Sequence, residues 1–128
     1  MTVHLRAVRF ELPEPASAAG FPFNLPFAQA AVTFTTPITF LVGENGSGKS
    51  TFLEALATAA RLITAGAEDA AADRTLAHLQ PLADAARLDW AHRTRTGFFL
   101  RAEDFFGYVK RLHQLRAGLQ AELRDVET

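Results

Sequence analysis

Apolar and polar side chains alternate at the start of the chain. Val3, Leu5 and Ala7 fall on one side of an extended backbone, with polar side chains between them. A period of two residues is typical of a strand with one buried face. Residues 13–15, Pro-Glu-Pro, end the alternation because proline cannot donate to a strand ladder. The pattern predicts a half-buried strand within residues 2–12.

Three further segments have extended character. The proline spacing of residues 21–27 forbids a helix, and we expect their aromatic rings to clamp over the core. Residues 31–36 alternate valine and phenylalanine with threonine, and residues 38–42 are apolar except for one threonine. The break at Pro37 predicts that these last two segments are strands in a close antiparallel pair.

The second half of the chain has mainly helical spacing. Apolar residues recur every three or four positions in residues 52–63 and in residues 76–88, where Pro81 should interrupt or kink the helix. Residues 97–100, Gly-Phe-Phe-Leu, predict a third core strand. Residues 102–126 predict a long amphipathic helix, whose apolar face contains Phe105, Phe106, Val109, Leu112, Leu115, Leu119 and Leu123.

Composition narrows the class of protein. The 128 residues have room for one domain, and a hydrophobic content of 48% is enough for a core. No uninterrupted apolar stretch approaches the ~20 residues that span a bilayer. With no cysteine the chain forms no disulfide or thiolate metal site, which is compatible with a cytoplasmic protein. The net charge of −1 gives no general electrostatic support for a DNA partner.

The chemistry is concentrated in residues 43–50, which read G-E-N-G-S-G-K-S and fit the pattern G-x-x-x-x-G-K-[S/T]. Glycines permit positive φ and a close backbone approach to phosphates, and the N-terminus of the following helix attracts anions. A predicted strand before the loop and a predicted helix after it provide the required context. The pattern predicts a nucleotide phosphate site formed by Gly43, Glu44, Asn45, Gly46, Ser47, Gly48, Lys49, Ser50 and Thr51.

Each polar side chain of this site has an expected role. Lys49 should reach the β- and γ-phosphates, Ser50 should ligate Mg²⁺, and Thr51 should contact the α-phosphate. Hydrolysis also needs a carboxylate at the end of a second strand. Glu103 is the best candidate, but it does not directly follow the apolar run of residues 97–100. An acid at a helix N-terminus is the commoner role for such a residue.

A basic concentration lies in the second half of the chain. It could contact phosphate or nucleic acid, although solvated loop arginines are the commoner outcome. Trp90 and Tyr108 are expected to be packed aromatics, and the histidines show no metal-ligand spacing. The members of the basic concentration are Arg87, His92, Arg93, Arg95 and Arg101.

Residues 40–51, F-L-V-G-E-N-G-S-G-K-S-T, resemble the Walker A motif of ABC-type ATPases. More closely, they resemble soluble AAA-family ATPases related to chromosome-structure and DNA-repair ATPases. Residues 21–26 and 97–103 look like a small group of bacterial predicted ATPases of that type, so the resemblance covers about residues 3–106. It implies an ABC-ATPase-like P-loop NTPase core that binds ATP with Mg²⁺ and has ATPase activity.

The resemblance also assigns roles outside the loop. It places residues 97–103 at a strand and its Q-loop, with Glu103 where the family's glutamine usually contacts Mg²⁺ and the attacking water. Lys49 and Glu103 are then the catalytic candidates. The family's signature motif, Walker B carboxylates and switch histidine are not found in these 128 residues. The chain therefore resembles the N-terminal half of such an ATPase, as a truncated product, a fragment or one part of a split protein.

Taken together, the sequence predicts an α/β P-loop core fragment with an antiparallel β layer and a long C-terminal helix. We expect MgATP binding with slow or no hydrolysis by the chain alone, and either a homo-oligomer or a partner chain that completes the ATPase. The alternatives are a non-catalytic nucleotide-binding module that associates through residues 102–126, and a small-molecule kinase with the arginines as a lid. The expected segments are a strand layer (1–42), the P-loop and its helix (43–64), a variable helical segment (65–96), a strand with a Q-loop-like segment (97–104) and a helix (105–126).

Overall fold

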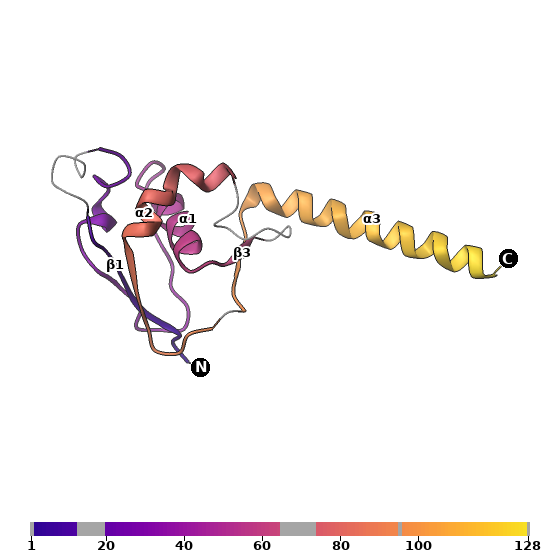
Figure 1. Cartoon of the computed structure of the whole chain (residues 1–128), viewed down its shortest axis with the longest axis horizontal. Helices are drawn as coiled ribbons and strands as arrows, with labels where there is room; N and C mark the ends of the chain where they lie inside the picture. The colour runs from indigo at the N-terminus through magenta and orange to yellow at the C-terminus, as the bar shows by residue number, and fades with distance from the viewer. Residues whose placement is uncertain (1, 13–19, 65–73, 95, 128) are drawn as a thin grey trace.

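A computed structural model describes residues 2–12, 20–64, 74–94 and 96–127, without the side chains of residues 74, 75, 103, 106 and 107. The fold is a mixed α/β arrangement in which a small body carries one long C-terminal helix (Figure 1). The strands are β1 (Leu5–Phe10), β2 (Val32–Thr33), β3 (Ile63–Thr64), β4 (Ala86–Trp90) and β5 (Phe98–Phe99). The helices are α1 (Lys49–Ala59), α2 (Gln80–Ala85) and α3 (Ala102–Glu127), with 3-10 turns at Pro26–Ala28 and Arg74–Leu79.

The expected antiparallel layer is a three-stranded sheet with the order β2-β1-β4. The register between β1 and β4 shifts between Leu5 and Ala7, which pair with Trp90 and Asp89. The extra residue on β1 is a bulge, and it reverses which side of the strand faces inward. Val8 is therefore fully buried, although the predicted apolar side names only Val3, Leu5 and Ala7.

The core lies where this sheet packs against α1 and α2. Val8 and Phe10 from β1 meet Phe52 and Ala55 from α1 and Leu82 from α2. Phe23 is buried in the same cluster, so the expected aromatic clamp is confirmed there, although Phe21 is exposed.

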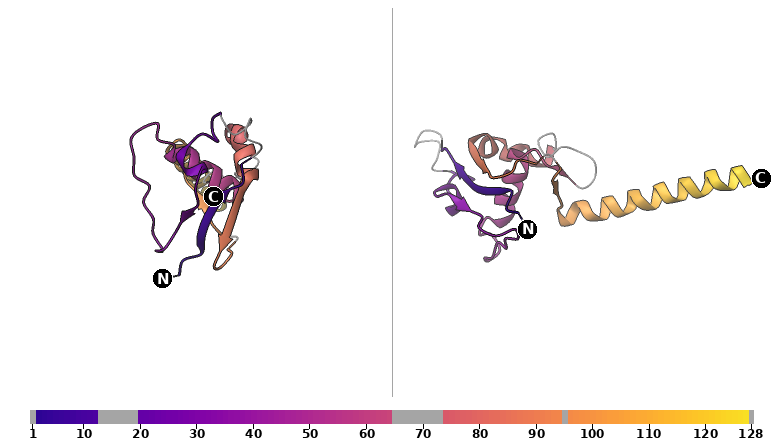
Figure 2. Two further views of the ribbon diagram at one scale, coloured as in Figure 1. Left: turned by 90° about the vertical axis from the view of Figure 1, so that its left-hand side faces the viewer. Right: turned by 90° about the horizontal axis from the view of Figure 1, so that it is seen from below.

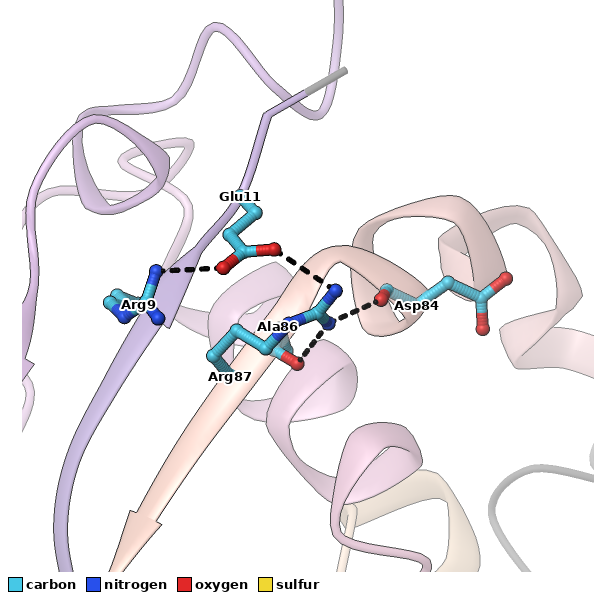
Figure 3. A network of polar contacts seen from close by, with 5 residues as sticks. All are labelled: Arg9, Glu11, Asp84, Ala86 and Arg87. Atoms are coloured by element: carbon cyan, nitrogen blue, oxygen red, sulfur yellow. Dashed lines mark hydrogen bonds and ion pairs between the residues drawn. The ribbon is translucent and has the colours of Figure 1, made fainter.

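An ion network joins the end of β1 to the start of β4 (Figure 3). The Glu11 carboxylate accepts from Arg9 at 3.0 Å and pairs with Arg87 at 3.0 Å. Arg87 also donates to the carbonyl of Asp84 at 3.0 Å, and the Glu11 amide donates to the carbonyl of Ala85 at 2.8 Å. These contacts fix the turn from α2 into β4 against β1.

The predicted strand over residues 38–42 is wrong. No strand is assigned to these residues, and β2 pairs with β1 rather than with them. Phe40 is 83% exposed and Val42 is 93% exposed. A continuous apolar strand is stable when neighbouring strands and helices cover both its faces, and the described part of the chain does not provide that cover.

Two helical predictions also need correction. α1 ends at Ala59, before the predicted boundary, and Ile63 belongs to β3. The predicted helix over residues 76–88 is divided into a 3-10 turn, α2 and β4, so that Ala86 and Leu88 lie in a strand. Pro81 lies in the first turn of α2, where its missing N–H costs nothing, and it therefore starts a helix rather than kinking one.

The remaining elements confirm the order of the sequence prediction but not the burial. β5 pairs in parallel with β3. Phe98 is 77% exposed, whereas Phe99 packs against the buried Ala57 and Leu76, so only one side of this strand meets the core. α3 forms as predicted and projects away from the body (Figure 1 and the right-hand view of Figure 2). Among the described helices, none is long and apolar enough to cross a membrane.

Candidate phosphate-binding site

The loop before α1 has the backbone conformation that a phosphate-binding turn needs. Gly46 and Gly48 have φ values of 84° and 96°, a region that side chains with a Cβ rarely occupy. The Ser47 amide donates to the carbonyl of Glu44 at 3.1 Å and closes the turn. A Cβ on Gly43 would lie 2.7 Å from the Ser47 hydroxyl, so a larger residue there would displace the Ser47 side chain.

α1 begins at Lys49 directly after this turn, with Gly48 as its N-cap residue. No side chain caps the first turn, and its amides have no partner within the helix. The positive end of the helix therefore faces the loop, next to the exposed Ser50 and the half-buried Thr51. This is the arrangement in which a helix N-terminus binds an anion.

The Lys49 ammonium folds back over the loop. It donates to the carbonyl of Gly43 at 2.5 Å, to the carbonyl of Glu44 at 2.8 Å and to the Ser47 hydroxyl at 3.2 Å. An ammonium has three N–H donors, so these contacts use all of them. The positive charge is consequently held at the mouth of the turn, beside the amides of the first helical turn.

Aromatic side chains pack against the start of α1, next to the loop of residues 43–48. Phe27 contacts Phe52 in the first turn of α1, with ring centroids 5.2 Å apart, and contacts Phe10 of β1 at 5.5 Å. A Cβ on Gly48 would lie 3.3 Å from both Leu25 and Phe27, so the helix start sits close against these two side chains. The pattern of residues 21–27 predicts that they cover the core, but it does not predict that they also support the loop. The available signal is that they precede the loop in the chain.

An apolar groove of about 380 Å³ adjoins the loop. One wall is the exposed segment of residues 40–42, and the other is formed by Phe27 and Phe52. Ser47, Gly48 and Lys49 line its end. The groove is therefore continuous with the phosphate-binding turn.

The acidic candidates lie at the start of α3. Asp104 accepts from Arg101 at 2.7 Å and 3.0 Å, and both side chains are largely buried. In this ion pair the Asp104 carboxylate binds Arg101 and stabilises the start of α3. Glu103 lies in the same turn, but its side chain is outside the described residues, and its catalytic role stays a prediction.

Two described members of the predicted basic concentration, Arg87 and Arg101, are held in separate ion pairs. Arg87 pairs with Glu11 on β1, whereas Arg101 pairs with Asp104 on α3. Arg93 is exposed, and Arg95 lies outside the described residues. Across the described part of the chain, no three histidine, aspartate or glutamate side chains form a group that could hold a metal ion.

Comparison with known proteins identifies one matching family. Residues 24–64, about a third of the chain, match a family model described as an AAA domain. Comparisons with curated proteins and with solved structures gave no significant match. The family match supports an AAA-type, P-loop ATPase-like segment that binds nucleotide, and this family generally binds ATP with Mg²⁺. The predicted bacterial origin and the relation to an N-terminal half stay predictions.

Proposed function

We propose that the protein binds MgATP through residues 43–51, as the nucleotide-binding part of an ABC-type P-loop ATPase. The observation that carries this proposal is the Lys49 ammonium, held over a glycine turn at the exposed N-terminus of α1. A cation and a row of free amides facing one turn are complementary to a polyphosphate.

Each group of the loop has a defined task in this proposal. Lys49 exchanges its carbonyl contacts for the β- and γ-phosphates, because hydrogen bonds between two charged groups are stronger than those to a neutral carbonyl. The Ser50 hydroxyl is an oxygen donor of the kind that Mg²⁺ prefers, and it stands exposed in the first turn of α1. Thr51 contacts the α-phosphate. A cytoplasmic location belongs to the same proposal, since the site needs ATP and Mg²⁺ around it.

Hydrolysis by these residues alone should be slow or absent. An attacking water must be positioned, and Mg²⁺ must be held by a carboxylate at a strand end. In the sequence only Glu103 offers that carboxylate, and its neighbour Asp104 is committed to Arg101. We therefore propose that another polypeptide segment, on this or a second chain, completes the site for turnover.

Calorimetric titration of MgATP into the protein tests the binding site. Lys49→Ala should weaken binding about 10- to 100-fold, because a hydrogen bond to a charged group contributes ~1.5–3 kcal/mol. The matched control is Lys110→Ala, which removes the chain's other lysine from the exposed face of α3 and should bind as wild type. Equal MgATP affinity of the Lys49→Ala and wild-type proteins would overturn the proposal. Steady ATP turnover that Lys49→Ala abolishes would contradict the slow-hydrolysis part of it.

One alternative gains support from a specific observation. The apolar side chains of α3 are exposed, which favours a nucleotide-binding module that associates with other molecules. The kinase alternative loses support, since Arg87 and Arg101 are committed to separate ion pairs and do not form a lid.

A further inference from the structure

α3 carries a stripe of exposed apolar side chains along the part that projects from the body (Figure 1). Leu119 lies near its middle and is 53% exposed. On a helix of ~3.6 residues per turn, side chains three, four and seven positions away share one face. The stripe consists of Leu112, Leu115, Leu119, Leu123 and Val126, and beyond it Tyr108 and Phe105 continue the same face toward the start of α3.

The spacing of this stripe is symmetric about Leu119. Leu115 and Leu123 each lie four residues from it, and Leu112 and Val126 each lie seven residues from it. If a second copy of the helix runs in the opposite direction with Leu119 against Leu119, every apolar side chain of the stripe meets another apolar side chain. Leu112 then faces Val126 of the second copy, and Leu115 faces Leu123.

Charge decides between the two directions of pairing. Arg111 and Asp125 lie on the same flank of the stripe, one near each end. An antiparallel pair brings each flank against the same flank of the other copy, reversed, so Arg111 meets Asp125 of the second copy. Their levels along the axis differ by two residues, or ~3 Å. A parallel pair instead brings opposite flanks together. Asp125 then meets Glu127 of the second copy at levels two residues apart, and Arg111 and Glu122 lie near Arg116 and Glu127 at levels five residues, or ~7.5 Å, apart, so that all of these pairs have like charges.

We propose that α3 is a dimerisation element, which pairs with α3 of a second copy of this chain in an antiparallel arrangement centred on Leu119. Burial of the apolar stripe drives the association, and the flanking charges select its direction. Because the stripe is distant in sequence from residues 43–51, this inference does not depend on nucleotide binding.

The first test measures the molecular mass of the full protein by sedimentation over a range of concentrations. The wild type should reach the mass of two chains and stop there. Leu119→Lys puts two ammonium groups at the centre of the pair and should weaken dimerisation at least about tenfold. The matched control is Ala121→Lys, two residues on and ~200° around the helix, which should dimerise as wild type. A wild type that stays monomeric, or one that associates without limit, would overturn the proposal.

The second test uses the absence of native cysteine to read the direction of pairing. In the antiparallel pair, position 112 of one copy lies next to position 126 of the other, and the two positions 112 are ~21 Å apart along the axis. A disulfide needs Cα atoms within ~7 Å. An oxidised mixture of Leu112→Cys and Val126→Cys proteins should therefore give mixed dimers, and Leu112→Cys alone should give none. Efficient self-linking of Leu112→Cys would show a parallel pair instead.

The third test exchanges the flanking charges. Arg111→Asp should weaken the dimer, and the double variant Arg111→Asp with Asp125→Arg should restore it. In a parallel pair Arg111→Asp would relieve repulsion and strengthen the dimer, which would contradict the proposal. Lys49→Ala should dimerise as wild type, so a failed nucleotide site and a failed dimer give different results.

Discussion

β1 and residues 38–42 have a similar share of apolar residues, but one face of β1 is buried and residues 38–42 are mostly exposed. β1 is paired on both edges, by β2 and β4, and its Val8 is fully buried. Residues 38–42 lead into the candidate phosphate site, yet Phe40 and Val42 are mostly exposed. An alternating strand needs cover on one face only, and α1 and α2 provide it. A continuously apolar strand needs cover on both faces, and the described residues do not provide it for residues 38–42.

The phosphate-binding turn forms next to this exposed segment without a paired strand. Its shape depends on Gly46 and Gly48, on the contacts of Lys49, and on the packing of Phe27 under the first turn of α1. All of these contacts lie within residues 24–64, the range that matches the AAA domain. The loop of residues 43–51 therefore depends on contacts with nearby residues, whereas a strand over residues 38–42 would depend on partners distant in the chain.

The largest expected effect tests the difference in burial directly. Phe52→Ala removes a ring that is 3% exposed and should lower the free energy of unfolding by ~3–5 kcal/mol, because it leaves a cavity in the core. The matched substitution Phe40→Ala should change it by less than ~0.5 kcal/mol. Urea denaturation of both variants provides the measurement. A similar large loss for Phe40→Ala would mean that residues 38–42 are packed in solution.

A second prediction sharpens the view that the turn is determined locally. Gly48→Ala forces a side chain into positive φ against Leu25 and Phe27, and it should cost ~1–2 kcal/mol and weaken MgATP binding. Gly20→Ala is the control, because nothing lies within 4 Å of the added Cβ. Thermal unfolding and nucleotide titration measure both effects. If Gly48→Ala leaves both unchanged, the turn does not depend on this backbone conformation.

The smallest expected effect concerns the ion network of β1. Glu11→Gln removes the pairs with Arg9 and Arg87, whose side chains are about half exposed. We expect a loss of at most ~1 kcal/mol in unfolding free energy, and less in concentrated salt, because solvent and ions screen such pairs. Denaturation curves at low and high salt test this. A loss that is larger and insensitive to salt would assign the network a packing role instead.

Particular residues show how far the sequence could predict this fold. The shape of residues 43–51 can be predicted from the sequence because the φ of its glycines, its turn and its helix start depend on neighbouring residues, and its role in binding nucleotide stays a prediction. The alternation of Val3, Leu5 and Ala7 does not predict the buried Val8, because a bulge depends on the partner strand β4. Residues 86–88 are expected to continue a helix for a similar reason: Ala86 has helical spacing from Leu82 and Ala83, but pairing with β1 outweighs that preference.

The sequence is enough to predict the glycine turn, the helix that follows it and the amphipathic α3, since these depend on contacts between residues close together in the chain. Which apolar segments are covered depends instead on tertiary packing. Burial requires a partner from elsewhere in the molecule, so β1 is buried by α1 and α2 while residues 38–42 and α3 keep exposed apolar faces. The hydrophobic pattern predicts which face of a segment needs to be buried, and the packed structure shows whether another segment buries that face.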